Sequence, residues 1–144
     1  MKTKTALVSL AAVAAASLAW ATPTKISNED AFALFSALNQ IQPGLSAGNV
    51  GKAAEDIWNL KGIAEAYQTS SGRHARDGER AKSAKDPMAA AQAVQDDWDA
   101  FRLAVVTVDL QPLTLTDDEL KEAKITPGLY APILHYLTAT AAKR

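Results

Sequence analysis

A regular spacing of apolar residues predicts a helix over the stretch from Asn49 to Tyr67. Its apolar side chains recur at alternating steps of about three and four residues, which places them along one face of an α-helix. These positions are Val50, Ala53, Ile57, Leu60, Ala64 and Tyr67, and the polar positions beside them include Lys52, Glu55, Asp56, Asn59, Lys61 and Glu65. We therefore predict a central helix whose polar side is solvated and against whose apolar stripe the other segments pack.

A shorter amphipathic helix is predicted before the central one. Ser27 is placed to cap the amide of Asp30, and the acidic residues that follow it suit the positive end of a helix. Pro43-Gly44 should end this helix. The flanking segments, Thr22 to Lys25 and Leu45 to Gly48, should be a polar lead and a connecting loop. The apolar face of the helix comprises Ala31, Leu34, Phe35, Leu38 and Ile41.

Two interpretations are open for the end of the central helix. The run from Gln68 to Gly72 is poor in helix formers, so the helix could end near Ser70 and be followed by a loose segment. Alternatively, it continues to about Lys85 and projects beyond the core. We favour the extended helix, because no proline interrupts it before Asp86-Pro87.

A third helix should begin at Asp86-Pro87, a pair that suits the N-cap and the first helical position. The three-and-four spacing returns along it, so it should pack against the central helix as an antiparallel helical hairpin. Its apolar positions are Ala91, Val94, Trp98, Phe101 and Val105.

The period changes after Phe101. Val106, Val108 and Leu110 alternate with polar residues, which is typical of extended chain. Since no partner strand is recognisable, we predict an extended strap across the hairpin near residues 105–115.

Two further helical segments are expected in the C-terminal part of the chain. Thr116 to Glu119 forms a capping box, with Leu115 and Leu120 placed for a hydrophobic staple, and starts a short helical turn. Thr126-Pro127 should start the last helix, with Leu129, Ile133, Tyr136 and Leu137 facing inward. The predicted fold class is all-α, an antiparallel helical hairpin with packed N- and C-terminal helices and a short extended segment near 105–115.

Residues 1–21 have the pattern of a signal peptide. Two lysines precede an apolar run from Ala6 to Leu18, and Ala19-Trp20-Ala21 has the small residues of a cleavage site. We expect cleavage between Ala21 and Thr22, export to the periplasm or secretion, and a single domain over residues 22–144. The alternative is an uncleaved alanine-rich helix, acting as a membrane anchor or as a structural helix.

The net charge and the absence of cysteine limit the kinds of partner and chemistry that we expect. The chain has 144 residues, a net charge of −1 and no cysteine. So weak a charge does not steer a protein towards nucleic acid or an anionic membrane. The absence of cysteine excludes disulfides and thiolate chemistry. We predict no nucleic-acid partner and no membrane association after cleavage of the signal peptide.

Candidate catalytic and metal-binding residues are few. His74 lies in a basic, polar run and His135 has no acidic neighbour in sequence, so we interpret His74 as a solvated surface side chain. Helix-bundle metal sites use a Glu-x-x-His pattern, which does not occur here. We therefore predict no catalytic residue, no cofactor and no metal.

The densest acidic cluster lies on the third predicted helix. It consists of Asp96, Asp97 and Asp99, and Glu55-Asp56 could face it across the hairpin. Because its members are staggered around Trp98, we interpret the cluster as a solvated face.

An aromatic residue and a basic strip are the candidates for protein contact. Trp58 lies beside the apolar stripe, so either the core covers it or it is an exposed anchor for a partner. From residue 73 to residue 86, five basic and three acidic side chains leave a net charge of +2, with no aromatic residue between them to stack on bases. The possible interaction residues are Trp58, Arg73, Arg76 and Arg80.

Several parts of the sequence carry a family resemblance. ISNEDAFALFSALNQI is similar to the opening helix of small uncharacterised all-helical proteins encoded by tailed phages and prophages. The central helix, followed by VTVDLQPLTLTDDEL and ITPGLYAPILHYL, resembles that family's helix, extended segment and closing helix. The resemblance covers most of residues 26–137 and implies a structural protein with no catalytic residue to carry over. The chain departs from that family in its export signal and in the small residues Gly78 and Ala81.

We accordingly predict a non-enzymatic exported helical protein that acts by protein–protein contact or self-association. One alternative is a phage- or prophage-derived structural accessory protein, which virion genes beside its own would support. Another is a small-ligand carrier or an enzyme that uses the space between the helices.

Overall fold

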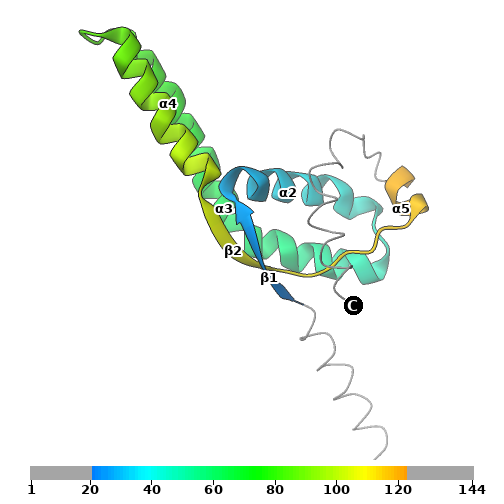
Figure 1. Ribbon diagram of the computed structural model, residues 1–144. Coiled ribbons are helices and arrows are strands. Elements are labelled where there is room, and N and C mark those ends of the chain that lie inside the picture. The colour runs from blue at the N-terminus through cyan, green and yellow to red at the C-terminus, as the bar shows by residue number, and fades with distance from the viewer. Residues whose placement is uncertain (1–20, 123–144) are drawn as a thin grey trace, which may run out of the picture.

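Residues 21–122, which the computed structural model describes, form a base and a helical hairpin that projects from it (Figure 1). Most of these residues are helical, as predicted, but a two-stranded sheet is also present. The fold is therefore mainly, not wholly, α-helical. In chain order the elements are β1 (Thr22–Ser27), α2 (Asn28–Ile41), the 3-10 turn η1 (Gln42–Gly44), α3 (Ala47–Ala81), α4 (Pro87–Leu103), β2 (Val105–Leu110) and α5 (Asp117–Glu122).

The base is built around one apolar core shared by α2, the first half of α3 and the sheet. Helix α2 begins as predicted, with the Ser27 hydroxyl accepting the Asp30 N–H at 3.1 Å. Because α2 and α3 are joined by a short connection through η1, their apolar faces meet side by side. The buried side chains of the core are Ile26, Ala31, Leu34, Ala37, Leu38, Ile41, Ala53, Leu60, Val108, Leu110 and Leu113.

The prediction of a polar lead at Thr22 to Lys25 is wrong, because these residues belong to strand β1. This strand pairs antiparallel with β2, so that Thr22 lies opposite Leu110 and Ser27 opposite Val105. The segment that follows α4 is thus a paired strand and not a lone strap. Ile26 is the one fully buried side chain of β1. So polar a strand has almost no hydrophobic alternation by which its sequence could be recognised.

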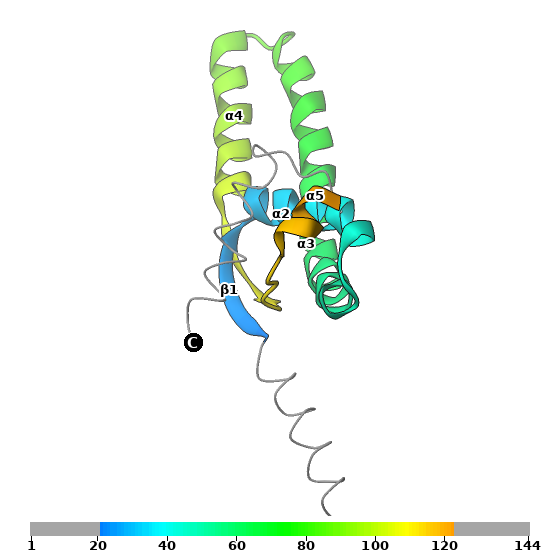
Figure 2. The same cartoon turned by 90° about the vertical axis from the view of Figure 1, so that its right-hand side faces the viewer.

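Helix α3 runs without interruption from Ala47 to Ala81, which confirms the extended helix over one that ends near Ser70. Its first half lies along α2, and its second half changes direction and leaves the base beside α4, as two views show (Figures 1 and 2). Asp86 caps α4 as predicted, accepting the Ala89 N–H at 3.1 Å. The distal half of α3 and α4 thus form the antiparallel hairpin.

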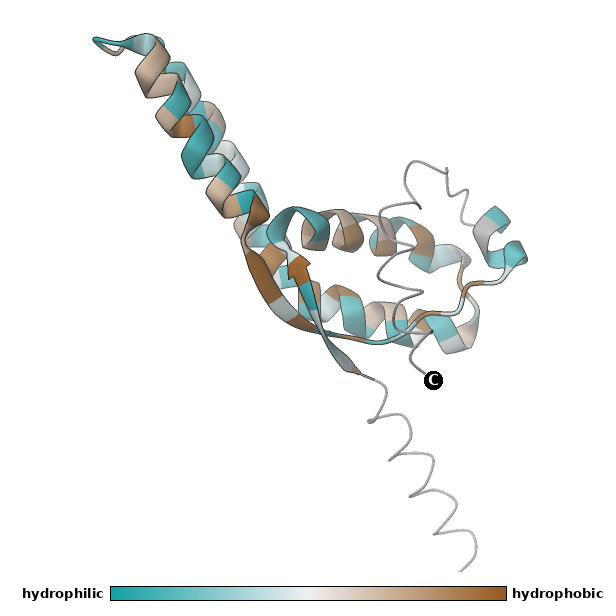
Figure 3. Cartoon of the chain, in the orientation of Figure 1, coloured by the Kyte–Doolittle hydropathy of each residue, from teal (hydrophilic) through white to brown (hydrophobic). Residues whose placement is uncertain are grey.

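Helix α4 buries none of its side chains completely. Val94, Trp98 and Phe101 of its predicted stripe are half-buried, but Ala91 is exposed and Val105, which is 64% exposed, belongs to β2. The predicted stripe is wrong at both ends because a projecting pair of helices covers each helix on one side only. Hydrophilic residues cover most of the hairpin, whereas hydrophobic residues gather in the base and where α4 meets β2 (Figure 3).

The predicted capping box at the start of α5 is confirmed. The Thr116 hydroxyl accepts the Glu119 N–H at 3.2 Å, and the Glu119 carboxylate accepts the Thr116 N–H at 2.8 Å. Several predictions lie outside the described residues: the signal peptide up to residue 20, the Leu120 side chain of the staple, the last helix from Thr126-Pro127, and His135.

Candidate functional site

Five ring side chains gather where the hairpin joins the base. Phe32 of α2 stacks on Tyr67 of α3 with ring centroids 4.7 Å apart, and the Tyr67 ring lies 5.2 Å from that of Trp98 on α4. The Trp98 ring stacks on His74 at 5.1 Å and lies 6.1 Å from Phe101. Aromatic pairs at these separations stabilise packing beyond the area they bury. The ring cluster therefore ties both helices of the hairpin to α2.

A pocket of about 290 Å³ opens between α3 and α4 beside this cluster, and we call it the hairpin groove. Three of the rings and Val94 give it apolar walls. Charged side chains stand around them, so the groove is an amphipathic surface. Its lining includes Arg73, His74 and Asp77 of α3 and Val94, Asp97, Trp98 and Phe101 of α4.

Two exposed charges of opposite sign flank the groove. Within the described part of the chain, neither Arg73 on α3 nor Asp97 on α4 makes a hydrogen bond or an ion pair, whereas Asp77 lies 3.5 Å from an Arg80 guanidinium nitrogen. The groove thus offers one unpaired positive charge and one unpaired negative charge to any molecule that covers it.

His74 is not the solvated surface side chain that its sequence context predicts. Its ring lies flat against Trp98, and its Nδ1 atom is shielded from solvent with no hydrogen-bond partner among residues 21–122. The basic residues next to His74 in sequence do not indicate this burial, because the covering residue, Trp98, comes from α4. The ring of His74 contributes a packing surface to the wall of the groove.

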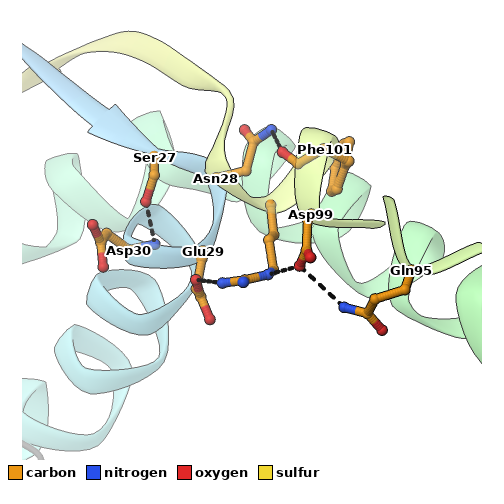
Figure 4. A network of polar contacts seen from close by, with 8 residues as sticks. Ser27, Asn28, Glu29, Asp30, Gln95, Asp99 and Phe101 are labelled. Carbon is orange, nitrogen blue, oxygen red and sulfur yellow. Dashed lines mark hydrogen bonds and ion pairs between the residues drawn. The ribbon is translucent and has the colours of Figure 1, made fainter. Parts of the chain in front are cut away.

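A polar network fixes the end of α4 onto the start of α2 (Figure 4). Arg102 donates to Glu29 at 2.8 Å through Nη1 and to Asp99 at 2.7 Å through Nε. Asn28, which is buried, donates its side-chain amide to the Phe101 carbonyl at 2.8 Å. The contacts of Arg102 with Glu29 and of Asn28 with Phe101 each join residues 73 positions apart and set where the hairpin leaves the base.

The acidic residues of α4 do not form one surface. Asp96 is exposed and accepts a hydrogen bond from Gln92 at 2.7 Å, as a solvated face would. The prediction is wrong for Asp99, which is half-buried, because the hydrogen bond from Arg102 holds its carboxylate and keeps its pKa below the usual value. The suggestion that Glu55-Asp56 faces this cluster across the hairpin is wrong, because the pair lies in the base and contacts Gln111.

The four predicted interaction residues do not come together. Trp58 is 74% exposed, which excludes a covering core, and it lies on the base half of α3 with the Lys61 Nζ 5.7 Å from its ring centroid. The arginines lie on the hairpin half of the same helix. Arg73 flanks the groove, Arg76 is exposed, and Arg80 pairs with Asp77. Trp58 is therefore a separate surface feature.

Asp56 is a buried acid that the sequence pattern does not reveal. Although it lies on the predicted solvated side of the central helix, it is 1% exposed and accepts the backbone N–H of Gln111. Burial raises the pKa of its carboxyl to about 7, and the hydrogen bond from Gln111 opposes part of that rise. Asp56 thus anchors the chain that follows β2 to α3.

Glu119 is a second buried acid, with the opposite electrostatics. Its carboxylate accepts the Ser46 N–H at 2.7 Å, the Asn49 side-chain amide at 3.0 Å and the Thr116 N–H. These donors lower its pKa to about 2. The Ser46 side chain makes no capping hydrogen bond of its own, so Glu119 caps the start of α3 from α5.

Neither buried acid belongs to a metal-binding cluster within the described part of the chain. Among residues 21–122, no three histidine or acidic side chains lie close enough together to share a metal ion, and none of the helices in this range is long and apolar enough to cross a membrane. Comparison with known protein families, with curated proteins and with solved structures finds no match to this chain.

Proposed function

We propose that this chain is a non-enzymatic exported protein that acts through protein–protein contact made by its hairpin. The hairpin groove supports this proposal most strongly, because α3 and α4 leave Val94, Trp98 and Phe101 half-buried at its wall. Protein interfaces commonly place aromatic side chains at the centre and charged ones at the rim. Arg73 and Asp97 would supply that rim.

A charge placed in the groove should block the contact. We expect residues 22–144 to associate, with themselves or with a protein of a cell-envelope extract, and the Val94→Glu variant to lose that association because its carboxylate would be buried at the interface. Size-exclusion chromatography with light scattering, with and without extract, measures this. Ala93→Glu is the matched control, since Ala93 is the adjacent exposed residue of α4. A native chain that stays monomeric and captures nothing would refute the proposal, as would association that survives Val94→Glu.

A small-ligand carrier is the second candidate, favoured by the groove itself. Its volume of about 290 Å³ is close to the lower limit for ligand pockets, which is about 300 Å³. Native mass spectrometry of the protein purified from its own source would detect a bound small molecule. A discrete added mass that disappears in Val94→Glu would favour the carrier over protein contact.

Export is proposed from the signal-peptide pattern, and the start of β1 at Thr22 is compatible with it. A cut between Ala21 and Thr22 would leave all six paired residues of β1 in the mature chain. We expect the intact mass of the exported protein to equal that of residues 22–144. Recovery of an exported protein that still carries residues 1–21 would contradict the proposed cleavage.

A further inference from the structure

The two arms of the hairpin carry opposite net charges. From residue 73 to residue 86, the α3 arm and the tip have five basic and three acidic residues, a net charge of +2. Helix α4 has three acidic residues and one basic residue, a net charge of −2. Without the tip, residues 73–81 of α3 have three basic and two acidic residues, a net charge of +1. The two arms are therefore neighbouring ridges whose net charges have opposite sign.

The groove between these ridges also has a positive charge on its α3 side and a negative charge on its α4 side. The unpaired Arg73 lies on the positive ridge, the unpaired Asp97 lies on the negative ridge, and both line the same pocket. Val94 and Trp98 lie between them as half-buried apolar surface. A surface with an apolar centre and one charge of each sign on opposite sides is complementary to itself under a two-fold rotation.

We infer that the groove binds a second copy of this chain, hairpin against hairpin, with Arg73 of each copy against the partner's Asp97. This inference rests on the proposed function and names its partner. A two-fold axis parallel to the hairpin places each α3 on the partner's α4. A four-helix bundle results in which both hairpin tips point the same way and all neighbouring helices are antiparallel.

Electrostatics selects this axis over its alternative. A two-fold axis across the hairpin would lay α3 on the partner's α3 and bring like charges together, which is unfavourable. The parallel axis forms the Arg73–Asp97 contact twice and covers Val94 and Trp98 of both copies. An unrelated partner would not need opposite charges on the two sides of the groove. A second copy related by this axis does need them, because each side meets the other side of its partner.

A charge-exchange experiment tests the inference. Arg73→Glu and Asp97→Arg each replace both opposite-charge contacts by like-charge contacts, so each variant alone should dimerise about tenfold or more weakly than the native chain. In an equimolar mixture, every contact joins opposite charges again. We expect the mixture to recover the dimer and form one-to-one heterodimers, measured by analytical ultracentrifugation of residues 22–144.

Controls separate the interface from the fold. Both side chains are exposed, so circular dichroism of each variant should match that of the native chain. Asp96→Arg makes the same charge change at the neighbouring position outside the groove and should leave the dimer intact.

Three results would overturn the inference. These are a native chain that stays monomeric at low salt, single variants that dimerise as the native chain does, and a mixture that does not recover the dimer. If the native chain is monomeric but still captures an envelope protein in a manner sensitive to Val94→Glu, the second copy is excluded and the proposed contact function stands. If nothing associates, both fail.

Discussion

Raising the pH from about 4 to about 7 should lower the free energy of unfolding, and Asp56→Asn should remove most of this fall. Burial raises the pKa of Asp56 from 3.8 to about 7, so over this range the folded chain holds a proton that the unfolded chain releases. The stabilisation is fully present below pH 3.8 and is lost as the pH rises through about 7. A rise of about three pKa units corresponds to at most roughly 4 kcal/mol.

Urea denaturation at a series of pH values would measure this slope. Asn keeps an oxygen that can accept the Gln111 N–H but does not ionise, so the Asp56→Asn variant should retain the fold. Asp109→Asn removes an exposed carboxylate of β2 and serves as the control with an unchanged slope. Glu55 and Lys52 lie near Asp56 and modify its titration, but their effects on its pKa are smaller than that of burial. A native slope that persists in Asp56→Asn would show that another group causes it.

Glu119→Gln should destabilise the base at pH 7 by about 2–3 kcal/mol, the second large effect that we expect. The Glu119 carboxylate is 7% exposed and accepts hydrogen bonds from Ser46, Asn49 and Thr116. An amide presents an NH₂ group where the carboxylate presents an oxygen, so at least one of these donors loses its partner. The start of α3 would also lose the negative charge that offsets its dipole.

The pH dependence of this effect has the sign opposite to that of Asp56. Because the pKa of Glu119 is lowered from 4.5 to about 2, its stabilisation is present above pH 4.5 and is lost as the pH falls through about 2. The difference between native chain and Glu119→Gln in urea midpoint should therefore shrink between pH 5 and pH 2, on the order of the full effect. Asp118→Asn changes an exposed acid of the same helix and should have little effect. A loss that is equal at both pH values would contradict the electrostatic account.

Together the two acids predict a stability maximum in mildly acidic solution. Below about pH 4.5 the Glu119 contribution declines, and above about pH 4 the Asp56 contribution declines. Both groups lie in the base. Asp56 contacts Gln111, which follows β2, and Glu119 of α5 contacts Ser46 at the start of α3. The hairpin groove lies outside these contacts, so pH should affect the stability of the base more directly than the contact surface that we propose.

Local signals in the sequence determined most of the helices. Ser27 caps α2, Asp86-Pro87 starts α4, and the Thr116–Glu119 box starts α5, because each of these contacts joins residues about three positions apart. The apolar stripe of the central helix also holds within the base, where Ala53 and Leu60 are buried. Caps and periodicity are recognisable from sequence because the interacting groups are neighbours in the chain.

Only the tertiary structure decided which distant segments meet. Strand β1 is polar and forms because β2, some 80 residues later, presents a matching backbone edge. Asp56 is buried because residue 111 crosses its side of α3, and the ring of His74 is half-buried because Trp98 lies against it. The positions of Arg73 and Asp97 at one groove likewise depend on how α3 and α4 are paired. Such contacts depend on the path of the whole chain. The sequence around each contacting residue therefore does not predict them.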